Sequence, residues 1–208
     1  MHQALAQFFS ALTNPVESFL ERWKAVKDTR LTYRDRESWE KLHAAGQALL
    51  EKFLREDAPR LSEIQAAERG FTLDITDLDL PFVGIIDLVA ALDGKRTLVD
   101  FKTATSAYDP HEALLSDQLT AYQLAEPDAE QVALCVLIKT KTPRIEWLIT
   151  RRSADQLVEY LTKARFVAHE IKQGRFYKRT GKWCTWCEYL PVCTGDTPKA
   201  DETLVRLG

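Results

Sequence analysis

The sequence predicts an α/β fold in which one mixed β-sheet lies between two layers of helices, an α/β/α sandwich. Three observations support this: helical periodicity over the first 57 residues, five short β-forming segments between residues 65 and 150, and helical segments between and after those strands. We expect a single domain over residues 1–208. It comprises a helical N-terminal part (1–57), a core (65–173) and a cysteine-bearing C-terminal tail (174–208).

The N-terminal part is predicted to contain three helices. Apolar side chains recur every three or four residues up to residue 12 and resume from 16 to 26, and Asn14 and Pro15 interrupt the pattern. A longer amphipathic helix is predicted over residues 36–55, and Pro59 is expected to end it.

The core then changes to the period of strands. Asp93 and Gly94 separate the second and third strands and predict a tight hairpin. Strands are predicted over residues 65–75, 82–92, 97–101, 131–139 and 144–150, and helices over 116–124 and 153–173.

Composition and charge limit the function only broadly. Apolar residues make up 45% and charged residues 28% of the chain, as in ordinary globular proteins. No apolar run approaches the roughly 20 residues that span a membrane, and no signal peptide begins the chain, so we expect a cytoplasmic protein without a membrane partner. The net charge is −3, but residues 139–182 hold twelve Lys or Arg against four Asp or Glu. This basic segment is either a phosphate-contacting face or a solvated helix surface.

Two acids and a lysine interrupt the apolar strands, where charges are costly unless they bind something. Asp87 ends the sequence Gly-Ile-Ile-Asp on the second strand, and Asp100 and Lys102 form Asp-Phe-Lys at the end of the third. Pairing about the turn at Asp93 and Gly94 places Asp87 opposite Asp100. Opposed carboxylates repel one another unless a cation lies between them, so we expect Mg²⁺ or Mn²⁺ here.

The chemistry that this pattern favours is metal-assisted phosphodiester cleavage. Lys102 is expected on the same face as Asp100, where its ammonium can orient water or stabilise the phosphate. Gln118 and Tyr122 lie four residues apart on a predicted helix and share a face. The alternative is structural: Asp87 and Lys102 form a buried ion pair, and Gln118 and Tyr122 are a surface amide and a half-buried tyrosine.

These residues resemble the RecB-like branch of the PD-(D/E)xK nuclease superfamily, which includes AddB-like domains and CRISPR-associated adaptation nucleases. The resemblance implies a restriction-endonuclease-like fold and a DNA nuclease. It makes Asp87 the GxxD metal ligand, Asp100 and Lys102 the D-x-K pair, and Gln118 and Tyr122 the Q-x-x-x-Y motif. A helicase or another recombination or CRISPR protein is an implied partner beside DNA.

Two further metal ligands follow from the same resemblance. His2 begins a His-x-Ala-Leu pattern that the family uses as an additional ligand, and the backbone carbonyl of Phe101 completes the inner shell.

The cysteines also fit the family's iron–sulfur members. Cys184, Cys187 and Cys193 match a C-x2-C-x5-C trio, but the upstream fourth cysteine is missing, because the chain begins almost at His2. The ligand set is therefore incomplete, and Cys135 is expected to be a buried thiol in a strand. Either the chain is shortened from a longer protein, or this member lacks the segment.

Three functions remain open from the sequence. The first is a metal-dependent deoxyribonuclease acting on single strands or ends in repair, recombination or mobile-element biology. The second is a catalytically impaired nucleic-acid-binding module of the same fold. The third is an interaction protein stabilised by zinc or an iron–sulfur cluster, in which the acids are structural.

Overall fold

The computed structural model describes residues 1–29, 33, 37–75 and 80–204, in two compact units. The first unit runs from Met1 to Arg165 and the second from Phe166 to Gly208. No helix among the described residues has the length and apolar character needed to cross a membrane.

The first unit contains a five-stranded mixed sheet in the order β1-β2-β3-β4-β5. Strands β1 to β3 form an antiparallel meander, β4 lies parallel to β3, and β5 returns antiparallel to β4. The strands are β1 Leu61–Leu73, β2 Phe82–Leu92, β3 Lys95–Ala104, β4 Gln131–Ile138 and β5 Arg144–Thr150.

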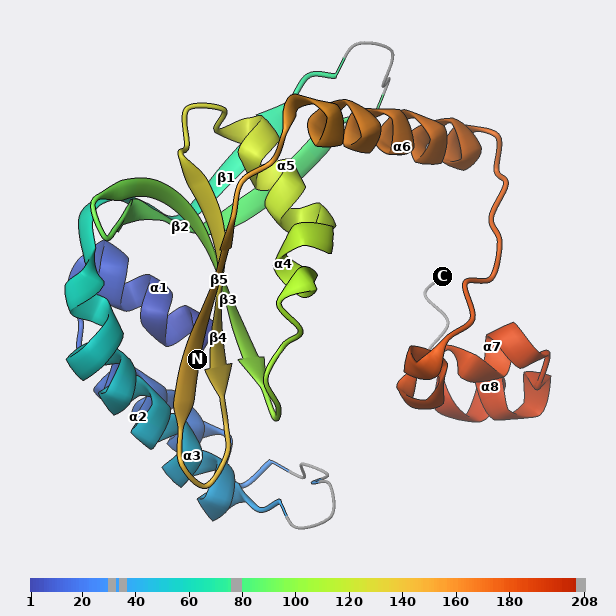
Figure 1. Ribbon diagram of the computed structural model, residues 1–208. Helices are drawn as coiled ribbons and strands as arrows, with labels where there is room; N and C mark the ends of the chain where they lie inside the picture. Colours follow the sequence, from blue (N-terminus) through green and yellow to red (C-terminus); the bar gives the residue numbers. More distant parts are fainter. Residues whose placement is uncertain (30–32, 34–36, 76–79, 205–208) are drawn as a thin grey trace. The chain divides into compact units, whose positions relative to one another are not determined.

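Helices cover both faces of this sheet, which confirms the predicted α/β/α sandwich (Figure 1). Helices α1, α2 and α3 lie over one face, and α4 and α5 lie over the other. Their bounds are α1 His2–Ala11, α2 Pro15–Ala25, α3 Trp39–Lys52, α4 His111–Leu115 and α5 Asp117–Ala125.

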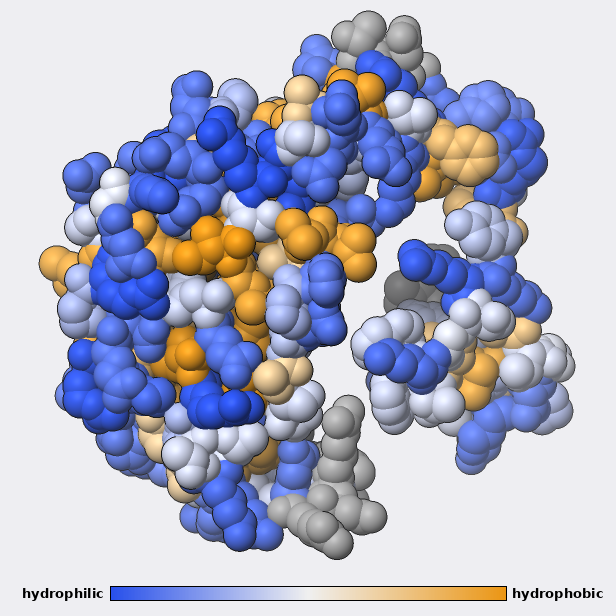
Figure 2. Space-filling view, in the orientation of Figure 1, coloured by the Kyte–Doolittle hydropathy of each residue, from blue (hydrophilic) through white to orange (hydrophobic). Residues whose placement is uncertain are grey.

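The sheet separates two hydrophobic cores. The core under α1 to α3 is built around Leu5, Phe53 and Phe101, and the core under α5 around Leu98 and Tyr122. Figure 2 shows the outer surface as mainly hydrophilic, with apolar residues gathered near the middle of this unit. A strand buried on both faces must carry apolar residues at successive positions, which explains the uninterrupted apolar sequence of β4.

Several predicted elements are confirmed at or near their expected ends. Asn14 caps α2, where its side chain accepts a hydrogen bond from the backbone N–H of Val16 at 3.0 Å. Asp93 and Gly94 both have positive φ angles, 51° and 81°, as a two-residue hairpin turn requires. Strands β2 and β5 have the predicted ends.

Other expectations need correction. The helical backbone does not end at Pro59: after α3 it continues as a π-helical turn, Phe53–Asp57, and a 3-10 turn, Ala58–Arg60. Strand β1 begins at Leu61 rather than at residue 65, and α4 was not predicted. The predicted start of α3 at Arg36 lies outside the described residues.

The second unit is described on its own. It contains the end of the long helix α6 (Ala154–Lys172), a 3-10 turn η3 (Lys182–Trp186), and two short helices, α7 (Leu190–Thr194) and α8 (Thr197–Thr203). None of its side chains from Lys172 to Tyr189 is fully buried.

Candidate active site

Asp87 lies where β2 and β3 separate. The backbone ladder between these strands runs from Leu92 opposite Lys95 to Leu88 opposite Val99 and stops one pair short of Asp87 and Asp100. The expected register is therefore correct, but the last pair is not made by the backbone.

Where this backbone ladder ends, the side chain of Asp87 makes the next contact between β2 and β3. Oδ2 of Asp87 accepts a hydrogen bond of 2.8 Å from the backbone N–H of Phe101. Nδ1 of His2, at the start of α1, lies 3.8 Å from the same oxygen. The structure thus places His2, Asp87 and the backbone of Phe101 close together.

Asp100 is buried inside the sheet, next to the ammonium group of Lys102. Its side chain is 1% exposed, and Oδ2 lies 2.6 Å from Nζ of Lys102, whose own side chain is 31% exposed. This ion pair is the contact that the structure shows for Oδ2 among the described residues, and it is not aligned as a regular hydrogen bond. Burial raises the pKa of the Asp100 carboxyl, and the neighbouring Lys102 only partly opposes this shift.

Gln118 and Tyr122, on α5, close a ring of polar contacts with these two residues. Nζ of Lys102 donates to Oε1 of Gln118 at 2.9 Å, and Nε2 of Gln118 donates to the hydroxyl of Tyr122 at 2.9 Å. The Tyr122 hydroxyl donates in turn to Oδ1 of Asp100 at 3.4 Å. Burial raises the pKa of Tyr122 far above its ordinary value, so this hydroxyl stays a donor.

Helix α5 is held in place by a buried arginine that the sequence analysis missed. Arg152, just after β5, is 5% exposed. Its guanidinium donates to the hydroxyl of Thr120 at 2.7 Å and to the backbone carbonyls of Ala113 and Ser116 at 2.7 and 2.9 Å. Arg152 therefore ties together the end of α4 and the start of α5. No local signal marks it, because all its partners lie more than 30 residues away in the chain.

A glycine and an aromatic ring form a second support. A Cβ at Gly84 would lie 2.4 Å from the tip of the Phe71 ring, so only glycine leaves room for that ring on β2. Phe71, on β1, meets Tyr122 edge to face with ring centroids 6.3 Å apart. Because Gly84 has no side chain, Phe71 of β1 can pack against Tyr122 of the site.

The cysteines do not form a ready-made metal site. Cys184, Cys187 and Cys193 lie in the second unit as free thiols, and Cys135 is a buried free thiol in β4. In the part of the chain that the structure describes, no group of three or more His, Cys, Asp or Glu side chains is arranged to hold a metal ion. The structure therefore gives no support to an iron–sulfur cluster.

The basic segment over residues 139–182 is less available than its charge suggests. Arg152 is buried, and Lys163 and Arg175 are paired with Asp117 and Glu170. Charge along the sequence therefore overstates the number of side chains that can contact phosphate.

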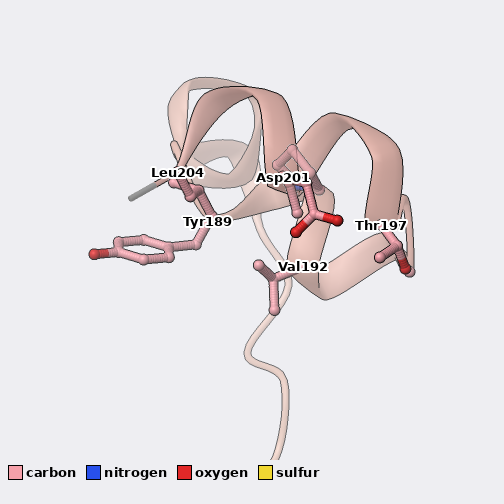
Figure 3. Close-up of a pocket in the computed structure, with 8 residues that line it drawn as sticks. Tyr189, Val192, Thr197, Asp201 and Leu204 are labelled. Atoms are coloured by element: carbon pink, nitrogen blue, oxygen red, sulfur yellow. The ribbon is translucent and has the colours of Figure 1, made fainter. Parts of the chain in front are cut away.

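The second unit also contains a hollow of about 490 Å³. Tyr189 and Thr197 lie on opposite sides of it, with Val192 and Asp201 between them (Figure 3). Its lining includes one carboxylate and no lysine or histidine, so it lacks the combination of groups found around Asp100.

Comparisons with known proteins point the same way as the geometry. A family model described as the PD-(D/E)XK nuclease superfamily matches residues 1–194. The crystal structure of a candidate exonuclease from Eubacterium rectale is similar with a TM-score of 0.51 at 14% identity, over 78% of this chain and 68% of that one. The crystal structure of SSO0001 has a TM-score of 0.48 at 12% identity, over 85% of this chain and 95% of that one. At 14% identity the first of these likenesses concerns the fold alone, and no conclusion is drawn from the second. No match was found among curated proteins.

Proposed function

The chain belongs to the PD-(D/E)XK nuclease superfamily, and we propose that it is a metal-dependent deoxyribonuclease with its active site around Asp87 and Asp100. Nucleases of this superfamily hydrolyse phosphodiester bonds. We base this on one observation: the buried Asp100 carboxylate lies 2.6 Å from the ammonium of Lys102, which also donates to the amide of Gln118.

The donor types of this site suit a divalent cation, although His2, Asp87 and Asp100 do not form a ready-made group of metal ligands in the described part of the chain. A buried carboxylate is unfavourable by itself, and the ammonium of Lys102 and a bound divalent cation would both offset that cost. Asp87 and Asp100 would supply carboxylate oxygens, Phe101 its backbone carbonyl, and His2 an imidazole nitrogen. Two carboxylates with open water positions suit Mg²⁺, and an imidazole in the set favours Mn²⁺.

When bound, such a cation lowers the pKa of a coordinated water and offsets the negative charge that develops on the phosphate. The chain's own residues prepare the rest of the reaction. Lys102 is placed by Asp100 and Gln118, so that its ammonium can orient the attacking water or bind a phosphate oxygen. Asp87 keeps β3 in register through the N–H of Phe101.

Gln118 and Tyr122 position the lysine and the buried acid. The amide of Gln118 accepts from Lys102 and donates to Tyr122, so it holds the ammonium at one side of Asp100. We assign the chain to the RecB-like branch on this pair and on the matching spacing of Asp87, Asp100 and Lys102. By the same analogy, the substrate is single-stranded DNA or a DNA end.

Cleavage of end-labelled single-stranded and duplex DNA with Mn²⁺, Mg²⁺ or EDTA tests this function. We expect cutting only with the cation, and its loss in the Asp100→Ala variant by at least about 100-fold, the usual scale for removing a group that stabilises the transition state. Asp128→Ala, an exposed acid outside the site, is the matched control and should retain activity. Equal cutting by Asp100→Ala would refute the site, and a folded, metal-loaded wild type without activity would favour the impaired module.

A further inference from the structure

The second unit exposes an unusual number of large aromatic side chains in one short segment. Between Arg175 and Tyr189, five aromatic residues are each at least 63% exposed. Aromatic rings of this size are ordinarily buried in a core or an interface, since each can remove 150–250 Å² from water, by general surveys. They are Phe176, Tyr177, Trp183, Trp186 and Tyr189.

Cationic side chains alternate with these rings. The same segment contains four Lys or Arg residues and one acid, Glu188. Because Arg175 is paired with Glu170 and Lys178 donates to the carbonyl of Cys193, the phosphate contacts are assigned to Arg179 and Lys182. Nζ of Lys182 lies 4.6 Å from the ring centroid of Trp183, and the rings of Trp183 and Trp186 are 6.1 Å apart. Charge and aromatic surface therefore occur together rather than on separate faces.

This combination favours a nucleic-acid strand over other occupants. Protein interfaces are enriched in aromatic residues but depleted in lysine. A membrane-surface segment needs a continuous apolar face on a helix, whereas residues 173–181 form no regular helix. Single-stranded nucleic acid needs both features, since bases stack on rings and phosphates pair with cations.

We propose that Arg175–Tyr189 is a platform for single-stranded DNA, on which bases stack while neighbouring basic residues contact the phosphates. The proposal deepens the nuclease function and rests on it for the choice of DNA. It gives the second unit a role in DNA binding that does not depend on Cys184, Cys187 and Cys193.

Binding is measured separately from cleavage. Fluorescence anisotropy of labelled oligothymidylate is followed in EDTA with the Asp100→Ala protein as the parent, so that neither metal nor activity enters the result. We expect the double variants Phe176→Ala/Tyr177→Ala and Trp183→Ala/Trp186→Ala to bind at least about 25-fold more weakly, because each loses two stacked rings and one ring alone contributes about 5-fold or more. Intrinsic tryptophan fluorescence should be quenched on binding by the parent.

Three controls keep the test decisive. Trp183→Phe/Trp186→Phe retains stacking surfaces and should recover most of the affinity, which a merely structural role of the indoles would not allow. Phe166→Ala removes an equally exposed ring on α6, outside the segment, and should change affinity less than about twofold, within ordinary surface effects. Arg179→Gln and Lys182→Gln should each reduce the slope of log affinity against log salt by about 0.7.

The outcomes separate the two proposals. Normal binding by both alanine double variants, or unchanged tryptophan fluorescence with bound DNA, overturns the platform whatever the nuclease assay shows. Weak binding by the double variants supports the platform even if Asp100→Ala proves active and the catalytic assignment fails.

Discussion

At the scale of single residues, the buried charge of Asp100 lowers the folding stability of the metal-free protein. Its carboxylate is surrounded by protein, and among the described residues Oδ2 contacts only the partly exposed ammonium of Lys102. Groups held in this way are typical of functional sites, where folding stability is given up for binding or chemistry.

The substitution Asp100→Asn should therefore stabilise the metal-free protein at neutral pH. Burial raises the folded-state pKa of Asp100, so the folded protein binds this proton more tightly than the unfolded chain does. Asp100 therefore contributes less to folding stability as the pH rises from 3.8, the ordinary pKa of an aspartate, through the raised pKa of the folded protein. Asparagine does not titrate.

Urea unfolding in EDTA checks this sign. We expect a higher midpoint for Asp100→Asn than for wild type at pH 7 to 8, and a difference that shrinks as pH approaches 4. A variant that is less stable at pH 8 and unchanged at pH 4 would mean that the pair with Lys102 outweighs the burial of the charge.

Prediction from sequence succeeded best for site residues whose spacing is local. Asp100 and Lys102 share a face because strand side chains alternate, and Gln118 and Tyr122 share one because helix positions four apart do. Arg152 could not be found in this way, because its role is defined only by contacts made across the fold. The catalytic roles of the site residues stay predictions.

At the scale of elements, strand β2 was easier to predict than strand β1 and helix α4. Strand β2 lies between Pro81 and the Asp93 turn, so its ends are marked in the sequence. Strand β1 is an edge strand with a bulge between Ser62 and Ala66, which hides its alternation. Helix α4 has five residues, too few to show a helical period.

Loss of the buried guanidinium should weaken the attachment of α5. Arg152→Leu leaves the carbonyl of Ala113 without this donor, and an unsatisfied buried group costs about 1–3 kcal/mol. The Ser116 carbonyl and the Thr120 hydroxyl also lose a bond to the guanidinium but keep the one between them. We expect a loss of roughly 2–4 kcal/mol in the free energy of unfolding.

Urea titration of this variant is compared with Arg151→Leu, an exposed neighbour. The control should lie within about 0.5 kcal/mol of wild type. Equal stability of the two variants would show that Arg152 does not hold α5.

Replacement of the strand glycine should push β1 away from the site. Gly84→Ala places a methyl group against the Phe71 ring, and overpacking of this kind typically costs about 1–3 kcal/mol. In a Phe71→Ala background the same change should be close to neutral, because the obstructing ring is gone.

A double-mutant cycle by urea unfolding measures this coupling. An additive cycle would contradict the proposed contact between the two positions.

At the scale of the whole molecule, the chain separates into a sheet-bearing unit with the acid–lysine site and a smaller unit with the cysteines and exposed aromatics. The first holds the mixed sheet and the residues proposed to hydrolyse phosphodiester bonds. The second was predicted to be a tail of the same single domain, and its compactness comes from short helices whose individual signals are weak in the sequence.

Mn²⁺ titration, followed by electron paramagnetic resonance of the free ion, tests whether Asp87 and Asp100 bind one catalytic cation. We expect one site per wild-type chain, no comparable site in Asp87→Asn or Asp100→Asn, and retention of the site in Asp128→Asn. Cleavage should rise with occupancy of that site. Undiminished Mn²⁺ binding by both Asp87→Asn and Asp100→Asn would show that these two acids do not bind the cation.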